Sequence, residues 1–181
     1  MNSGWDIRLV PLSEEDIPRV QALLVQAADY FRELADAKVA SDMAEQLFRD
    51  VKETPHRHLM GILQDEEMVG LLDFRLRYPA EDAAQLGLIL LRPDVRGKGL
   101  GSLAMDIWET WLDVQTPIER VRASVPAHMR RAQRFFFKRE YHLTGESYRV
   151  AVGAARPRLL ILEKLLRLKS LEEETEEAPQ A

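Results

Sequence analysis

Three glycines at alternate positions mark the segment with the clearest chemical meaning, Arg96-Gly97-Lys98-Gly99-Leu100-Gly101. Glycine lets the backbone approach a ligand closely and adopt turns that a Cβ atom would obstruct. The residues after Gly99 have helical periodicity, so the loop leads into a helix N-terminus. Unpaired N–H groups and the positive end of the helix dipole favour anions there. This combination predicts a pyrophosphate-binding site.

Two other glycine-rich loops do not fit this segment. The P-loop of nucleoside triphosphatases needs the spacing Gly-x-x-x-x-Gly-Lys-Ser/Thr, which the chain lacks. The dinucleotide fingerprint Gly-x-Gly-x-x-Gly needs a third glycine at position 102, which is Ser102. A tight turn between a strand and a helix, with no ligand, is the remaining alternative.

The glycine loop lies between a predicted buried strand and a predicted amphipathic helix. Residues 86–91 are continuously apolar, as is typical of a central strand covered on both faces. After residues 92–95 the apolar side chains recur at helical spacing. They are Leu100, Leu103, Ala104, Ile107, Trp108, Trp111 and Leu112.

The remaining periodicity predicts a mixed α/β fold, a sheet of about six to seven strands flanked by about four helices. Further strands are expected at 7–10, 59–63, 68–78, 120–125, 147–152 and 159–163. Further helices are expected at about 17–31, 41–52 and 129–139. The predicted order is β-α-α-β-β-β-α-β-α-β-β.

With this loop in this order of elements, the chain resembles the GNAT acetyltransferase family. The family motif Arg/Gln-x-x-Gly-x-Gly/Ala is matched by Arg96, Gly99 and Gly101, and the resemblance extends over about residues 7–164. It implies acetyl-CoA as co-substrate and transfer of its acetyl group to a primary amine of a small molecule or peptide, by direct attack in a ternary complex. It also implies a gap between the 86–91 and 120–125 strands, where thioester and amine meet. The coenzyme-binding residues it implies are Ile89, Leu90, Leu91, Arg96, Gly97, Lys98, Gly99, Leu100, Gly101, Ser102, Phe136 and Lys138.

The chain departs from the family where protons are usually moved. Phe136 occupies the position of a tyrosine that commonly protonates the departing thiolate, and Met129 that of an asparagine. Gln85 stands where the histone-acetyltransferase branch has a general-base glutamate, and an amide cannot take a proton at neutral pH. Weak replacement candidates are Glu81, Asp82, Tyr141 and His142. The catalytic residues thus stay unassigned, and a non-catalytic acyl-CoA-binding or sensing module is the alternative function.

Two groups of charged residues have both a structural and a functional interpretation. Arg130, Arg134 and Lys138 repeat at helical spacing, either as a solvated face or as a contact for the coenzyme's 3′-phosphate. Asp29, Tyr30, Glu33 and Asp36 lie near the join of the first two predicted helices. They form either a solvated helix end or an acidic rim that favours a cationic amine.

Composition excludes several other classes of protein. The 181 residues include no cysteine, which removes disulfides and thiol nucleophiles and suits a cytoplasmic location. The net charge of −5 lies in the glutamates of the last eleven residues, so the body is about neutral, unlike a nucleic-acid-binding protein. We expect one domain over 1–170, an acidic disordered tail over 171–181, no bound metal, no membrane partner, and a homodimer as one option.

Overall fold

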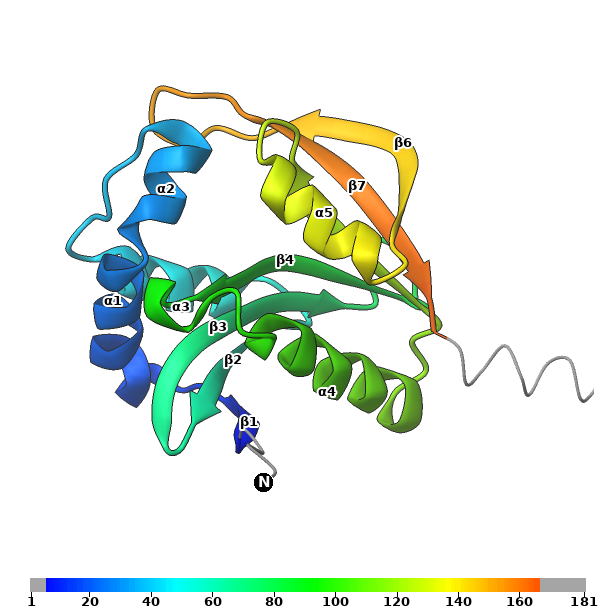
Figure 1. Cartoon of the computed structure of the whole chain (residues 1–181), viewed down its shortest axis with the longest axis horizontal. Helices are drawn as coiled ribbons and strands as arrows, with labels where there is room; N and C mark the ends of the chain where they lie inside the picture. The colour runs from blue at the N-terminus through cyan, green and yellow to red at the C-terminus, as the bar shows by residue number, and fades with distance from the viewer. Residues whose placement is uncertain (1–5, 167–181) are drawn as a thin grey trace, which may run out of the picture.

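The fold was analysed in a computed structural model, which describes residues 6–166. The predicted tail at 171–181 and the last residues of the predicted domain lie outside this range. A seven-stranded mixed sheet has the order β1-β2-β3-β4-β5-β7-β6 (Figure 1). The strands are β1 (Ile7–Pro11), β2 (Arg57–Gln64), β3 (Glu67–Leu76), β4 (Ala83–Leu91), β5 (Arg120–Pro126), β6 (His142–Arg149) and β7 (Arg158–Leu165). β4 and β5 run parallel, and the other neighbouring strands run antiparallel.

Helices cover both faces of this sheet. They are α1 (Ile17–Gln26), α2 (Ala28–Ala35), α3 (Met43–Glu53), α4 (Leu100–Gln115) and α5 (Arg130–Lys138). The apolar residues of α1 and α3 share a cluster with Leu71 and Leu90 on one face. Those of α4 and α5 share a second cluster on the opposite face. None of these helices is long and apolar enough to cross a membrane, within the part of the chain that the structure describes.

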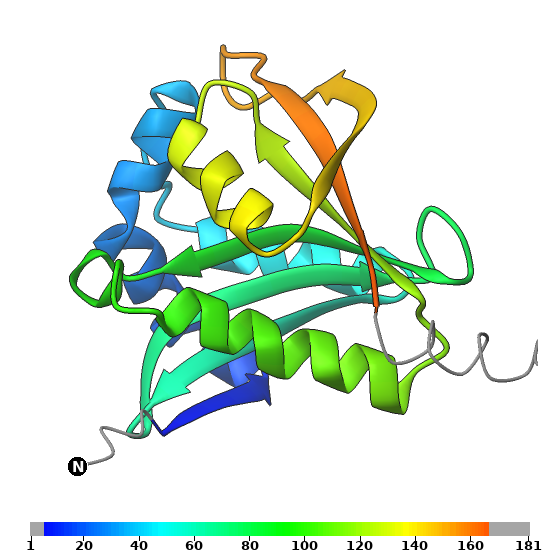
Figure 2. The same ribbon diagram turned by 45° about the vertical axis from the view of Figure 1, so that its right-hand side comes forward.

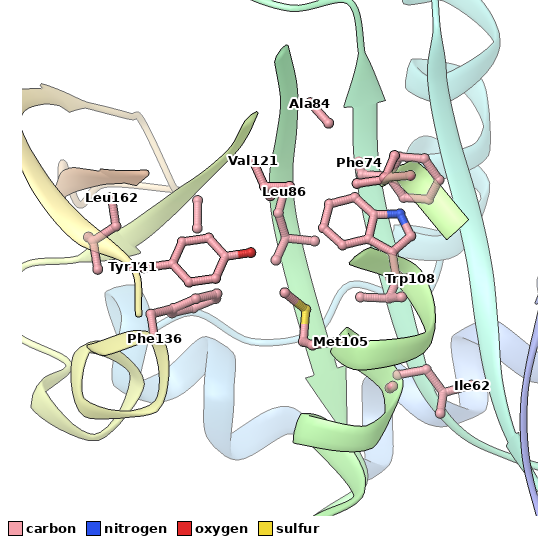
Figure 3. Close-up of a cluster of buried hydrophobic side chains, with 14 of the residues drawn as sticks. Ile62, Phe74, Ala84, Leu86, Met105, Trp108, Val121, Phe136, Tyr141 and Leu162 are labelled. Atoms are coloured by element: carbon pink, nitrogen blue, oxygen red, sulfur yellow. The ribbon is translucent and has the colours of Figure 1, made fainter. Parts of the chain in front are cut away.

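The larger cluster is built around aromatic side chains. Trp108 of α4 is fully buried, and its ring lies 5.1 Å from that of Phe74 on β3. Leu86 and Met105 lie between this pair and the rings of Phe136 and Tyr141 (Figure 3). The helical periodicity predicted for α4 is confirmed, because its apolar stripe faces this core.

A bulge at Gly87 changes the direction of the central strand. β4 pairs with β3 along its length, but the register shifts so that Asp73 faces Leu88 while Phe74 faces Leu86. Leu86 therefore packs with the α4 cluster, and Leu88 and Leu90 pack with the α1–α3 cluster. Without the extra residue these three side chains would share one face.

Beyond the bulge, β4 and β5 separate. Their parallel pairing runs from Ala83–Arg120 to Leu86–Ala123 and then stops. β3 continues to pair with β4 as far as Leu91, and β7 continues to pair with β5 as far as Pro126. Figure 2 shows the two strands diverging from their common end. The expected gap between them is confirmed.

The predicted fold class and order are confirmed, with three local differences. The helix predicted over 17–31 is two helices, α1 and α2, because the backbone leaves helical geometry at Ala27 (φ −98°, ψ 26°). β4 begins at Ala83 rather than at 86, since three more residues pair with β5, two of them also with β3. β6 spans 142–149 rather than 147–152. All eight of its residues are exposed, so pairing with β7 defines it rather than an apolar pattern.

Candidate active site

A cavity of about 750 Å³ lies where β4 and β5 separate. Its walls come from β4, β5, α2, α5 and the glycine loop that precedes α4. Ten of the twelve residues expected to bind the coenzyme line it: Ile89, Leu90, Leu91, Arg96, Gly97, Gly99, Gly101, Ser102, Phe136 and Lys138. The other two do not: Lys98 is exposed, and the Leu100 side chain is buried in the core.

The glycine loop needs its glycines for different reasons. Gly97 and Gly99 have φ values of 74° and 88°, a left-handed conformation that other residues adopt only with strain. A Cβ atom on Gly99 would meet no protein atom within 4 Å, so the space beside it is open, and Gly99 lines the cavity. Gly101 is helical, and a Cβ there would lie 3.4 Å from both Leu91 and Phe135. The first two glycines shape the loop, and the third lets α4 pack closely against β4 and α5.

Gly99 is the N-cap of α4, which is sixteen residues long and carries no acidic residue in its first turn. The N–H groups of that turn have no partner inside the helix. No carboxylate of the helix therefore competes for its positive end. An anion in the cavity meets both the dipole and free donors here.

Arg96 holds the loop to its surroundings. Its Nε donates a hydrogen bond to the carbonyl oxygen of Leu91 at 2.8 Å, and its two Nη groups donate to the carboxylate of Asp29 on α2. The side-chain hydrogen bond from Arg96 is the main reason that the pKa of Asp29 lies below its usual 3.8. Arg96 lines the cavity, but these contacts fix its guanidinium.

The wall opposite the loop is basic. Arg131, Arg134 and Lys138 of α5 line the cavity, and a Cβ on Gly97 would lie 3.9 Å from the Arg131 Nη2 atom. Arg130 is exposed and does not line it, so the cationic side of the helix includes Arg131 in its place. Three cations of α5 thus line the same cavity as the first turn of α4, the positive end of that helix.

The outer edge of β4 forms the floor between these two walls. From Gly87 to Leu91 the strand has β3 on one side and no paired strand on the other, within residues 6–166. Backbone N–H and C=O groups on such an edge are free to pair with an extended ligand.

A family model for the "Acetyltransferase (GNAT) family" matches residues 22–141, about two thirds of the chain. The chain belongs to the GNAT family. It has the fold of a GNAT acetyltransferase, and the matched residues include the glycine loop. A search for sequence relatives among curated proteins gave no significant match.

Solved structures of other GNAT proteins share the fold. An acetyltransferase from Thermus thermophilus is 26% identical with a TM-score of 0.75, over 88% of this chain and 97% of that one. A Salmonella typhimurium acetyltransferase that modifies the N-terminal serine of a 50S ribosomal subunit protein has 14% identity and a TM-score of 0.76. That match covers 90% and 96% of the two chains. Spermidine N-acetyltransferase from Vibrio cholerae, solved with CoA and spermine, has 12% identity and a TM-score of 0.69, over 88% and 95%.

The four weak catalytic candidates do not line the cavity of this GNAT chain. Glu81 is exposed and lies 3.8 Å from Arg77, and Asp82 pairs with Arg120 at 2.8 Å. His142 is exposed on β6. Tyr141 is buried, and its hydroxyl donates to Glu109 at 2.8 Å. Burial, followed by the charge of Glu109, holds the pKa of Tyr141 well above 10.0.

Of the three positions that depart from the family motifs, Phe136 and Met129 line the cavity and Gln85 contacts a lining residue. Phe136 lines the cavity, and its ring stacks edge-on against Phe135 and Tyr141, each at 5.2 Å. Gln85 lies at the point where β4 and β5 separate, and its Nε2 donates to the hydroxyl of Ser124 at 2.7 Å. Met129 also lines the cavity as a buried apolar side chain.

Several lining residues were not among the sequence predictions, and Ser124 is the most informative. It lies on β5, one residue beyond the last pair with β4, and its Oγ is 2.9 Å from the hydroxyl of Tyr148 on β6. The strand alternates between buried Val121, Ala123, Val125 and more polar positions, so the pattern marks Ser124 as facing away from the core. Only the strand separation shows that this direction leads to a cavity.

Proposed function

We propose that this protein transfers the acetyl group of acetyl-CoA to a primary amine, by direct attack in a ternary complex. The observation that carries the proposal is the cavity between the separated strands, with the glycine loop at one end and a polar group, Ser124, at its apex. An acyl-enzyme on a thiol is excluded, because the chain has no cysteine.

The residues present fit an acyl-CoA. The space beside Gly99 and the free N–H groups of α4 suit a pyrophosphate, and Arg131, Arg134 and Lys138 suit a further phosphate. The unpaired edge of β4 suits the amide groups of the pantetheine arm. The bound coenzyme would supply an activated acyl group as a thioester.

The protein's own groups would position the acyl group and keep water away from it. The bulge at Gly87 directs the edge of β4 into the gap, so that backbone donors there can orient and polarise a carbonyl. Phe135, Phe136 and Met129 present apolar surface to the same space. Exclusion of water strengthens every electrostatic contact inside the site.

The acceptor would approach from the α2 side of the gap. Asp29 and Glu33 both line the cavity there, but the charge of Asp29 is neutralised by Arg96. Glu33 has no ion-pair partner within residues 6–166 and is free to attract an ammonium group. An amine acceptor also agrees with the two relatives whose substrates are a protein N-terminus and spermidine.

The decisive test is thiol release from acetyl-CoA, followed across polyamines, amino acids, aminoglycosides and peptides with free N-termini. We expect at least one amine to give one acetylated product per thiol released. Saturable binding of acetyl-CoA without thiol release for any amine would contradict the transferase. That result would instead support the non-catalytic acyl-CoA-binding module.

A further inference from the structure

A chain of three hydrogen-bonding side chains leads from the apex of the cavity to the surface. Gln85 on β4 donates its Nε2 hydrogen to the Oγ atom of Ser124 on β5 at 2.7 Å. Ser124 Oγ is in turn 2.9 Å from the hydroxyl of Tyr148 on β6. Ser124 lines the cavity and Tyr148 is 45% exposed, so the chain has one end inside and one end in water.

The donor from Gln85 allows this chain to run from the cavity to solvent, since either hydroxyl can donate in the hydrogen bond between Ser124 and Tyr148. A serine hydroxyl has one hydrogen and two lone pairs. In that direction the Gln85 amide occupies one lone pair of Ser124, and Ser124 donates its hydrogen to Tyr148. The second lone pair then remains to accept an N–H from a group in the cavity. The Tyr148 hydrogen is left to point to solvent.

We propose that Ser124 and Tyr148 carry a proton from the acceptor's ammonium group to solvent, with Gln85 as the positioning residue that orients Ser124. This inference rests on the proposed acetyl transfer to an amine. It also explains how the site works with an amide at position 85, since the chain needs a donor there and a carboxylate could only accept.

The ammonium gives a proton to Ser124 Oγ, while the Ser124 hydroxyl proton passes to Tyr148 and the Tyr148 proton passes to water. The freed amine lone pair forms the bond to the acyl carbon, and the carbon–sulfur bond breaks with its electron pair on sulfur. The nitrogen then loses a second proton, which the thiolate takes. One proton per turnover reaches solvent.

The charged groups around the chain are held in pairs. Arg122, two residues before Ser124 on the same strand, contacts Glu146 of β6 and lies 3.8 Å from Glu163 of β7. Under the bulge, the Asp73 carboxylate lies beside Gly87 and pairs with Arg57 at 2.6 Å.

His142 of β6 lies opposite Glu163 in the β6–β7 register, and Glu33 lines the cavity from α2. Of these carboxylates, Glu33 alone lines the cavity and has no ion-pair partner within residues 6–166, so its charge can hold an ammonium nearby. The two hydroxyls supply the path that leads out.

The test compares Ser124→Ala and Tyr148→Phe with the wild type, using the amine that the wild type acetylates fastest. We expect Ser124→Ala to lower kcat/KM at neutral pH by about 10²-fold, the low end of proton-transfer catalysis. The deficit should shrink as the pH approaches about 10, because the alkylamine then loses its proton in solution. Tyr148→Phe should lower kcat/KM by about tenfold or less, since water can occupy the exposed end of the chain.

Tyr78→Phe is the matched control, because Tyr78 is 43% exposed and does not line the cavity. Its pH profile should equal that of the wild type. A wild-type profile in both Ser124→Ala and Tyr148→Phe would overturn the relay while leaving acetyl transfer intact. Failure of the wild type to acetylate any amine would overturn the proposed function, and the relay with it.

A second measurement does not depend on turnover. The ¹³C resonance of Tyr148 Cζ, assigned by its loss in Tyr148→Phe, should move when the same amine is added to the protein. In Ser124→Ala the hydroxyl that connects the amine to Tyr148 is missing, so the resonance should not move when the amine is added. A shift of equal size in Ser124→Ala would contradict the connection between cavity and Tyr148.

Discussion

Phe136 and Tyr141 show how far residue type alone indicates a role. The sequence offers the tyrosine as a proton-transfer candidate and marks the phenylalanine as a lost acid. In the structure Phe136 lines the cavity, while Tyr141 is 1% exposed and gives its hydroxyl to Glu109. Figure 3 shows the two rings side by side. Of these two residues, only Phe136 lines the cavity.

The position of Phe136 predicts the effect of restoring the hydroxyl. Phe136→Tyr should raise kcat for acetyl transfer, by up to about 10²-fold, because a phenol can protonate the departing thiolate where the wild-type ring cannot. The measurement is kcat at saturating acetyl-CoA and amine. A kcat equal to or below that of the wild type would show that proton delivery to sulfur does not limit the reaction.

Residue spacing predicted the glycine loop well, since the need for positive φ and close approach is local to the chain. The positions of Ser124 and Arg131 could not be predicted in this way. Each is an ordinary polar residue of its element, and its exposure to the cavity depends on where a neighbouring strand or helix ends.

α2 is the element that joins the two walls of the site. Asp29 near its start pairs with Arg96 of the glycine loop, and the carbonyl oxygen of Glu33 near its end lies 2.9 Å from His128 Nε2, just before α5. The break at Ala27 separates α2 from α1 and so allows both contacts. No glycine or proline marks this break, which is why periodicity predicted one continuous helix.

Asp29→Asn should weaken CoA binding by up to about fivefold, because a half-exposed ion pair contributes about 0.2–1 kcal/mol and its loss loosens Arg96. The pKa of Asp29 is lowered from 3.8, so the carboxylate stays ionised at all pH values above that. The effect should therefore be the same at neutral and at mildly alkaline pH, and smaller in high salt.

Calorimetric titration with CoA measures this effect. Asp36→Asn is the control, since Asp36 is exposed, lies at the end of the same helix with φ 51°, and does not line the cavity. Asparagine tolerates this backbone conformation. Equal CoA affinity in all three proteins would mean that α2 does not brace the loop.

At the scale of the whole molecule, one buried carboxylate connects α4 to β7 and to the segment that follows α5. Glu109 of α4 accepts hydrogen bonds from Arg139 after α5, from Tyr141, and from Lys164 of β7, at 3.1, 2.8 and 2.7 Å. Sequence periodicity could not reveal this cluster, because its members are separated by up to 55 residues. It gives Lys164 a structural role.

Glu109→Ala should lower the free energy of unfolding by about 3–5 kcal/mol, because it leaves the largely buried Lys164 without its ion-pair partner and leaves Arg139 with the exposed Asp106 alone. Asp106→Ala is the control: Asp106 also pairs with Arg139, but its side chain is 64% exposed. Asp106→Ala should lower the free energy of unfolding by at most about 1 kcal/mol. Urea denaturation measures both, and equal losses in the two variants would contradict the bridging role of Glu109.

The separation of β4 and β5 is the feature of the whole molecule on which the proposed function depends. The order of elements could be predicted from periodicity, whereas the gap was expected only through the resemblance to the GNAT family. β4 and β5 pair through only four residues each, and the gap opens after the last pair, Leu86 with Ala123. A substitution in the glycine loop, at the other end of this gap, therefore tests whether the cavity binds the coenzyme.

That test is calorimetric titration of acetyl-CoA into the wild type, Gly99→Val and Gly145→Val. Gly99 and Gly145 have φ values of 88° and 86°, and a Cβ on either would meet no protein atom within 4 Å. Both variants should thus carry the same backbone strain, about 1–2 kcal/mol, but only Gly99 lines the cavity. We predict that the wild type and Gly145→Val bind acetyl-CoA with equal affinity and that folded Gly99→Val does not bind it. Wild-type affinity in folded Gly99→Val would contradict the assignment of this cavity to the coenzyme.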